Sequence, residues 1–178
     1  MENRNHEFLF YAAFEIRCGV EARMQEYLEV QQHISKRKRQ GWKVAQLARN
    51  IEDAFRLGEK DAVLRVLNKN TQKVEFEARY TPVKTSLRKK AEKLGNFLHS
   101  SKKIHDTSDD FWAKFRSELE KAVEELERAT SGRLLGPLLI HPNQKRVDMK
   151  LELQTEEEHE LTRKFTVGSE AILQIKYE

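Results

Sequence analysis

The sequence predicts an α+β protein, in which an antiparallel helical bundle carries a β-hairpin insertion and a C-terminal antiparallel β-meander follows. Three observations lead to this fold class. Apolar residues recur at spacings of three and four through most of residues 5–130, which is the period of one helix face. Alternation with a period of two interrupts that pattern near residues 62–80 and returns after Pro137. The 178 residues suffice for one compact unit. We therefore expect a helical bundle over residues 1–132 and a small β unit over residues 133–178 packed on it.

The first predicted helix covers residues 5–34 and carries two neighbouring stripes. A helix with two apolar stripes is buried along both, so we expect it in the centre of the bundle. Gly19 would permit a close approach by another helix, whereas Glu15, Arg23 and Glu26 are expected towards solvent. The first stripe contains Leu9, Ala13, Ile16, Val20, Met24 and Tyr27, and the second contains Phe10, Phe14, Arg17, Glu21, Met24 and Leu28.

The next elements alternate between helix and strand. A second helix is predicted over residues 43–57, and the alternating pattern of residues 62–80 predicts the hairpin. Asp61 could instead cap a short helix that ends at Leu67. A third helix is expected to begin at Thr81 as N-cap, with Pro82 in the first turn.

The last helix is predicted over residues 108–130, because Thr107 and Asp110 fit a capping box. Period-two patterns then predict three strands, which one apolar face joins into a meander. Such a small sheet needs a cover, for which the helices, the hairpin or a second subunit would serve. The three strands are 147–153, 161–167 and 171–177, with an acidic turn over residues 155–160 between the first two.

The charge is unevenly distributed along the chain. Residues 1–105 contain 22 Lys and Arg against 13 Asp and Glu, whereas residues 106–178 contain 11 against 16. This asymmetry suggests contact with an anionic partner such as RNA or DNA, or contact between the two halves of a subunit pair. One cysteine and the absence of a signal-like or membrane-spanning segment predict a cytoplasmic protein without a membrane partner.

Arg17 and Glu21 are the first candidate functional pair, because a spacing of four brings their side chains together on a helix. They lie among apolar residues, so a partly desolvated ion pair is expected. Such a pair would serve either in catalysis or as a structural contact to a neighbouring helix. The structural interpretation is favoured, since buried ion pairs need not be catalytic.

A basic segment follows the first helix and is the main candidate for nucleic-acid binding. Clustered cations next to a tryptophan can hold phosphates while the ring stacks on a base. The alternative is a solvated loop whose tryptophan packs at the start of the next helix. The candidate residues are Lys36, Arg37, Lys38, Arg39, Trp42 and Lys43, with Lys84, Arg88, Lys89 and Lys93 from the third helix.

Other chemistry is poorly represented in the sequence. The six histidines show no metal-binding spacing, and no cofactor or phosphate-loop motif is present, so no metal and no cofactor is predicted. Cys18 has no histidine nearby in the sequence to activate its thiol. His99 follows a predicted helix, where a histidine is explained by its favourable place at the helix end.

Two segments, residues 14–28 and 80–99, resemble the HEPN superfamily (higher eukaryotes and prokaryotes nucleotide-binding). Glu15, Arg17 and Glu21 match its Glu-x-Arg and following Glu, and the stretch from Leu94 to His99 matches a motif of a later helix. The resemblance implies an α-helical bundle that is often dimeric and occurs in RNA-targeting, toxin and defence systems. The RNase signature of the family, Arg-x4–6-His, is missing from the sequence.

The leading hypothesis is therefore a non-catalytic HEPN-like accessory or regulatory protein that binds nucleic acid and forms a homo-oligomer. One alternative is a divergent RNA-cleaving enzyme that uses Arg17, Glu21 and His99. The other is a purely protein-binding assembly subunit whose C-terminal sheet edge receives a partner strand.

Overall fold

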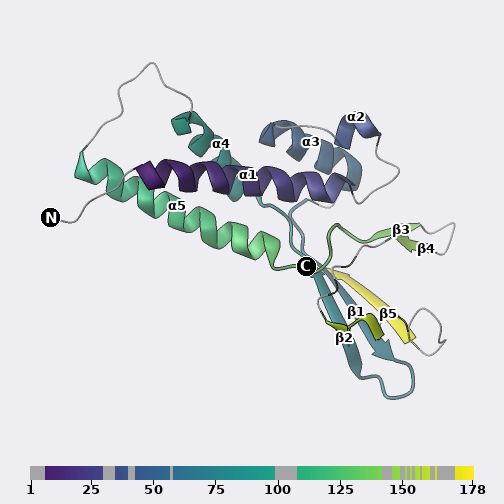
Figure 1. Cartoon of the computed structure of the whole chain (residues 1–178). Coiled ribbons are helices and arrows are strands. Elements are labelled where there is room, and N and C mark those ends of the chain that lie inside the picture. The colour runs from purple at the N-terminus through teal and green to yellow at the C-terminus, as the bar shows by residue number, and fades with distance from the viewer. Residues whose placement is uncertain are drawn as a thin grey trace. The chain divides into compact units, whose positions relative to one another are not determined.

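The computed structural model describes residues 7–29, 35–39, 43–56, 58–98, 108–141, 146–148 and 171–178, together with a few positions between 151 and 163. It confirms the α+β class, with helices and an antiparallel sheet (Figure 1). The chain divides into two compact units. The helical unit comprises Met1–Arg56 and Val83–Thr130, and the β unit comprises Leu57–Pro82 and Ser131–Glu178.

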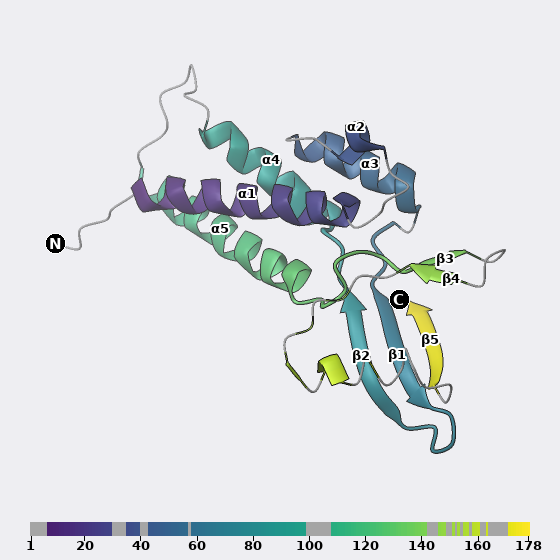
Figure 2. The same ribbon diagram turned by 45° about the vertical axis from the view of Figure 1, so that its right-hand side comes forward.

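The helical unit is organised around its first helix. This helix, α1, contacts each of the other four, and both views show it between α4 and α5 (Figures 1 and 2). Its first stripe is buried from Ala13 to Tyr27, which requires a neighbouring helix and explains this position. The second stripe is covered only in part, because Phe14, which was expected to be buried, is 52% exposed. The bounds are α1 Glu7–Glu29, α2 Lys36–Arg39, α3 Val44–Phe55, α4 Thr85–Leu98 and α5 Asp109–Thr130.

The helices do not all run antiparallel, which corrects the prediction. Near the starts of α1 and α5, the rings of Phe10 and Phe115 lie 5.8 Å apart. Near their ends, the Arg23 Nε donates to the Ala129 carbonyl oxygen over 3.0 Å. These two helices are therefore parallel. Helix α4 runs in the opposite direction to both (Figure 2), so reversal of the chain between α4 and α5 makes α5 parallel to α1.

Two predicted details of the helices are wrong. Arg23, expected in solvent, is only 6% exposed, because it lies on the stripe of Val20 and Tyr27. Helix α4 begins at Thr85 rather than immediately after Thr81. Thr81 is buried, and its hydroxyl oxygen lies only 2.8 Å from the point where a Cβ atom at Gly132 would be. The two residues therefore pack closely.

The β unit contains a three-stranded antiparallel sheet in the order β2-β1-β5 and a two-stranded sheet of β3 and β4. The hairpin of β1 and β2 is confirmed, with Ala62 opposite Tyr80, and the alternative helix ending at Leu67 is wrong. Along β2, Phe76, Ala78 and Tyr80 are buried while Glu75, Glu77 and Arg79 are exposed, as the alternation predicts, and Val74 at the start of the strand is the exception because it is exposed. The strands are β1 Ala62–Asn68, β2 Val74–Tyr80, β3 Leu139–His141, β4 Arg146–Asp148 and β5 Ala171–Tyr177.

The C-terminal strand does not pair as the predicted meander requires. Strand β5 pairs antiparallel with β1, from Ala62 opposite Tyr177 to Asn68 opposite Ala171. The reason is that β1 is apolar on both faces, which is typical of a central strand that needs a neighbour on each side. This pairing groups the hairpin with residues 131–178, whereas the sequence-based division at residue 132 separates them.

The remaining meander residues are only partly described. Of the predicted strand 161–167, the structure describes Arg163 alone, in helical conformation. The predicted acidic turn is also helical at the described positions of residues 156–160. Thr155 and Glu158 explain this, since each side chain accepts a hydrogen bond from the other's backbone N–H over 3.3 Å, which forms a capping box.

Candidate functional site

The Arg17–Glu21 pair forms as the spacing predicts. The Arg17 Nε donates to the Glu21 Oε1 over 3.0 Å, and the two side chains are 20% and 22% exposed. The guanidinium lies against Gly95 of α4, so closely that an added Cβ would stand 2.4 Å from the Arg17 Nη1. This contact favours the structural interpretation, because the guanidinium fills a space between two helices. His99, the third weak catalytic candidate, lies outside the described residues.

Arg23 is a buried charged side chain that the sequence analysis placed in solvent. Its Nε also donates to the Tyr27 hydroxyl over 3.2 Å, and its Nη1 pairs with the Glu26 carboxylate. The guanidinium lies 4.9 Å from the centre of the Tyr27 ring. The spacing of three and four to Glu26 and Tyr27 is the signal that could have identified it. Arg23 thus joins the ends of α1 and α5.

The basic segment of α2 is only partly described. Lys36 and Arg37 are exposed, and so is Lys43 immediately before α3. Arg39 is half-buried, and its Nε is enclosed without a hydrogen bond from the described residues. The Lys38 side chain and all of Trp42 lie outside the described residues, so the predicted pairing of cations with a stacking indole stays a prediction.

The basic residues of α4 have different surroundings. Lys84 and Arg88 are half-buried, and the Arg88 Nη2 donates to the Thr85 hydroxyl. Lys89 and Lys93 are exposed and one helical turn apart. The Lys93 Nζ lies 3.8 Å from the Glu118 Oε2 of α5. Of these exposed cations, Lys93 therefore faces α5, where the Glu118 carboxylate is its partner.

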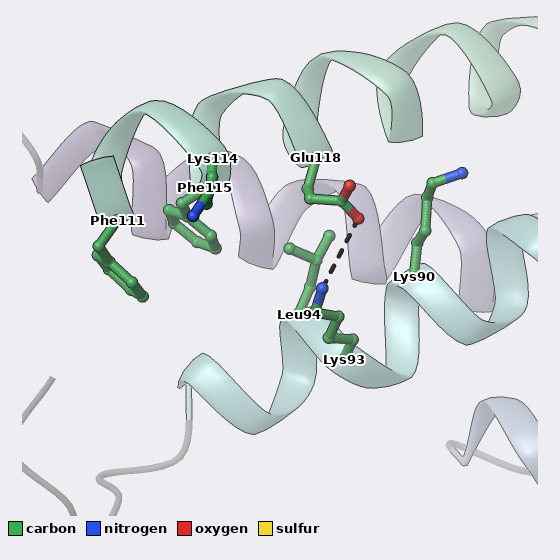
Figure 3. Close-up of a pocket in the computed structure, with 7 residues that line it drawn as sticks. All are labelled: Lys90, Lys93, Leu94, Phe111, Lys114, Phe115 and Glu118. Atoms are coloured by element: carbon green, nitrogen blue, oxygen red, sulfur yellow. Dashed lines mark ion pairs between the residues drawn. The ribbon is translucent and has the colours of Figure 1, made fainter. Parts of the chain in front are cut away.

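A pocket of about 170 Å³ lies between α4 and α5 (Figure 3). Its apolar lining consists of Leu94, Phe111 and Phe115, and the two phenylalanine rings are stacked at 6.1 Å with planes 10° apart. The charged lining consists of Lys90, Lys93, Lys114 and Glu118. An apolar body with a few charged groups at its edge is the usual composition of a small-ligand site.

The charges at the pocket differ in how firmly they are held. Lys93 and Glu118 are 60% and 38% exposed, and an exposed pair at 3.8 Å contributes little to stability. Lys114 is 75% exposed and pairs with Asp110, one turn earlier on α5, over 2.7 Å. Both lysines therefore remain accessible to an anion. In Figure 3 the Lys90 side chain points away from Glu118, and its amine pairs instead with Glu125.

Glu125 is held in the ionised form. Burial by itself would raise the pKa of this carboxyl, but hydrogen bonds from Lys90 and from the Ser86 hydroxyl outweigh it and lower the pKa below its usual value. The Ser86 bond measures 2.7 Å. This network joins α4 to α5 beside the pocket and fixes the spacing of the two helices there.

The pocket contains one of the ten residues predicted to bind nucleic acid, Lys93. The α2 residues are elsewhere, because α2 packs against α1 and α3. Sequence reasoning missed Phe111 and Lys114, since their helix is acidic overall. The available signal was the run Phe111–Phe115, which places two aromatic residues four apart with a lysine between them.

Other kinds of site are not found in the described part of the chain. No group of three or more His, Cys, Asp or Glu residues there could hold a metal ion. Likewise, none of the described helices has the length and apolar character needed to cross a bilayer. Burial, together with Glu21 and Glu15, raises the pKa of the Cys18 thiol above its usual value.

Comparisons with known families, with characterised proteins and with solved structures each find no match to this chain.

Proposed function

We propose that this protein is a non-catalytic, HEPN-like accessory or regulatory protein that binds single-stranded nucleic acid in the pocket between α4 and α5. The observation that carries the proposal is the combination of stacked Phe111 and Phe115 with exposed Lys93 and Lys114. Proteins that bind single strands use aromatic faces for the bases and cations for the phosphates. The HEPN resemblance connects such a role with toxin or defence systems.

The size of the pocket favours a one-ring base. An engineered apolar cavity of about 150 Å³ in another protein accommodates benzene. The 170 Å³ pocket is therefore suited to a pyrimidine. Glu118 supplies an acceptor at its edge, and a carboxylate recognises the amino group of cytosine. Uracil has an oxygen at that position, which the carboxylate would repel, so the pocket should prefer cytosine.

The lysines of the pocket and of α4 would contribute the part of the binding affinity that does not depend on the nucleotide sequence. Lys93 exchanges its weak contact with Glu118 for a phosphate, while Lys89 lies one turn earlier along the same side of α4. Phosphate contacts of this kind release counterions, so binding should weaken as salt rises. A longer oligonucleotide would be needed to reach the basic residues of α2 as well as the pocket.

The experiment compares fluorescence anisotropy of short oligocytidine and oligouridine at about 50 and 200 mM salt. We expect oligocytidine to bind roughly fivefold or more tightly. Phe111→Ala should weaken binding by about 1–3 kcal/mol through the lost stacking. Lys93→Ala should weaken both oligomers and reduce the salt slope by about 1.

The matched control is Lys176→Ala, since Lys176 is 65% exposed and lies in the β unit. Glu118→Ala should remove the cytosine preference without removing binding. Equal affinity of the wild type, Phe111→Ala and Lys93→Ala would contradict the pocket. If the wild type cleaves the oligonucleotides and both Arg17→Ala and His99→Ala abolish this cleavage, the divergent ribonuclease is supported instead.

A second candidate function is protein binding at the edge of the β unit. Strand β5 ends the three-stranded sheet, and its Ile172 and Leu173 are 40% and 48% exposed. Edge strands with exposed apolar residues readily accept a further strand. Two results together would favour this function over the first. The wild type would bind a stable protein partner that Leu173→Lys no longer binds, and it would show no salt-sensitive binding to nucleic acid.

A further inference from the structure

The two outer strands of the three-stranded sheet each have one side without a neighbouring strand in the described part of the chain. The strand order is β2-β1-β5, and Figure 2 shows β5 beside β1 at the margin of the sheet. Such a side presents backbone N–H and C=O groups that another strand can bind. The hydrogen bonds within the sheet determine which of these groups point outward.

The phase of the hydrogen bonds is known at the end of β5. The Glu178 N–H donates to the Asp61 carbonyl oxygen over 2.9 Å, and the Asp61 N–H donates to the Glu178 carbonyl oxygen over 3.0 Å. In an antiparallel ladder such doubly bonded pairs alternate with pairs that share no hydrogen bond. Every second residue of β5 from Glu178 therefore directs its backbone groups to β1, and the residues between them direct theirs outward. The outward residues are Ala171, Leu173, Ile175 and Tyr177.

The outer edge of β2 is protected. The Arg79 carbonyl oxygen points outward there and accepts a hydrogen bond from the Leu134 N–H over 3.0 Å. Glu77 lies two residues earlier, so its backbone groups point to the same edge. Charged side chains such as those of Glu77 and Arg79 are a common protection of edge strands against further pairing.

The outer edge of β5 lacks both kinds of protection. None of the described residues is hydrogen-bonded to the outward backbone groups of Leu173, Ile175 and Tyr177. Their side chains are apolar or aromatic and lie on the face of the sheet that is buried along β2. Leu173 is 48% exposed on this face, and Ile172 is 40% exposed on the other. A strand added to β5 would cover both side chains.

The charge on the other face of β5 indicates what an added strand carries. Lys176 is 65% exposed there, and the residue opposite it on β1 is the apolar Val63. Its ion pair with Glu178 over 3.0 Å is exposed and contributes little to stability. A carboxylate opposite Lys176 on an added strand would form a favourable cross-strand pair, whereas a cation there would be repelled.

From these observations we infer that β5 receives an extended segment of another protein, apolar but for one acidic position, as a fourth and antiparallel strand. The inference rests on the second proposed function, protein binding at the edge of the β unit, and names the chemistry of the partner. The segment has apolar residues opposite Tyr177, Ile175 and Leu173. It has a carboxylate opposite Lys176 and a further apolar residue opposite Ile172. Its main-chain hydrogen bonds supply affinity, and its alternate side chains supply selectivity.

The probe is a synthetic peptide with the central sequence Val-Glu-Val-Thr-Val-Val, and the comparison peptide has lysine in place of glutamate. Amide hydrogen exchange of the full chain, measured by NMR, shows whether the edge is free. Without peptide, we expect fast exchange at Leu173, Ile175 and Tyr177 and slow exchange at the residues between them, whose N–H groups donate to β1. The acidic peptide at about ten times its Kd should slow the outward amides by about tenfold.

Fluorescence anisotropy of the labelled peptides measures the selectivity. The acidic peptide should bind the wild type about fivefold more tightly than the lysine peptide. Lys176→Glu should reverse this preference. The control Lys73→Glu alters the net charge equally at an exposed position outside β5 and should leave the preference unchanged.

Methylation of the peptide nitrogens tests the phase of the hydrogen bonds. The valines opposite Ile175 and Leu173 would donate to β5, so methylation of either nitrogen should weaken binding by about fivefold or more. The glutamate and threonine nitrogens point away from β5, and their methylation is the matched control, with an expected change within about twofold.

Slow exchange of the outward amides without peptide would overturn the inference. If dilution restores fast exchange, a second copy covers the edge, and if dilution has no effect, the chain covers its own edge. Equal protection and equal affinity with both peptides in the wild type would reject the acidic partner and leave the second proposed function standing. If neither peptide slows the outward amides, strand addition at β5 fails and that function fails with it. Both peptide comparisons use the wild type, so they do not depend on the folding of Lys176→Glu.

Discussion

Arg23 shows how a charged residue can belong to the interior of a helical unit. Its guanidinium is buried, yet its Nε donates to the Ala129 carbonyl and the Tyr27 hydroxyl, while its Nη1 pairs with Glu26. The chemistry of arginine suits this role, because several donors in one plane can serve two helices at once. A lysine at the same position would provide one point charge for the same partners.

We expect Arg23→Ala to lower the free energy of unfolding by about 2–3 kcal/mol, since it leaves the buried Ala129 carbonyl without its charged donor. Urea unfolding followed by circular dichroism measures this change. Arg49→Ala removes an exposed arginine of α3 and is the control, with an expected change within about 0.5 kcal/mol. Equal effects of the two substitutions would show that the buried contacts of Arg23 contribute nothing.

Arg17 marks what helical spacing can and cannot predict for a single residue. The spacing of four predicted its ion pair with Glu21, and that pair is present. The contact with Gly95 could not be predicted, because it depends on which helix lies beside α1 and at what height. The burial of Arg23 was missed because Met24, the next residue, fits the same apolar stripe equally well.

At the scale of elements, α4 and α5 are held together by ionised groups beside their apolar contact. Glu125 of α5 accepts from Lys90 and Ser86 of α4, and these bonds lower the pKa of its carboxyl. A carboxyl whose pKa is lower in the folded state stabilises the protein above its unfolded pKa of about 4.3. This stabilisation disappears as the pH falls through the folded pKa.

We therefore expect Glu125→Gln to reduce stability at about pH 7 and to have progressively less effect below about pH 4. Urea midpoints of the variant and the wild type at several pH values provide the measurement. Glu120→Gln alters an exposed carboxylate of the same helix and should show no comparable pH dependence. If the difference in urea midpoint between Glu125→Gln and the wild type stays constant down to the lowest pH, ionisation of Glu125 has no role in stability.

Elements were predicted best where a period was long and uninterrupted. The pattern of residues 108–130 predicted α5 almost to the residue, and the alternation from Val74 to Tyr80 predicted β2. The start of α4 was misplaced because Thr81 and Pro82 are good helix starters locally. In the folded chain, packing of Thr81 against Gly132 takes priority over this local preference.

At the scale of the whole molecule, each unit is built from segments that are distant in the sequence. Helices α4 and α5 belong to the same unit as the first three helices, although the hairpin separates them in the sequence. Strand β5 pairs with β1, although both α4 and α5 lie between these strands in the sequence. The sequence identified the hairpin and the last strand separately, but periodicity holds no information about which strands pair. For the same reason it could not bring Lys93 and Phe111 into one pocket, since they belong to different helices.

The pairing of β5 with β1 can be tested with an engineered disulfide. Arg65 and Gln174 are directly opposite each other in the register. In a Cys18→Ser background, we expect Arg65→Cys with Gln174→Cys to form a disulfide under mild oxidation, because opposite residues bring their Cβ atoms within about 4.5–5.5 Å. Non-reducing peptide mapping detects the bond.

The control pairs Arg65→Cys with Leu173→Cys, since neighbouring residues of a strand point to opposite faces of the sheet. This control should remain reduced under the same conditions. A disulfide that forms equally well in both variants would indicate a mobile strand rather than a fixed register.

The pairing of β1 with β5 also has a consequence for synthesis on the ribosome. Strand β1 ends at Asn68 and its partner begins at Ala171, so about one hundred residues are translated between them. At about 5–20 residues per second, the hairpin waits roughly 5–20 s with one edge of β1 unpaired. During that interval the nascent chain presents an apolar strand edge, and a chaperone or a neighbouring nascent chain can occupy it before β5 arrives.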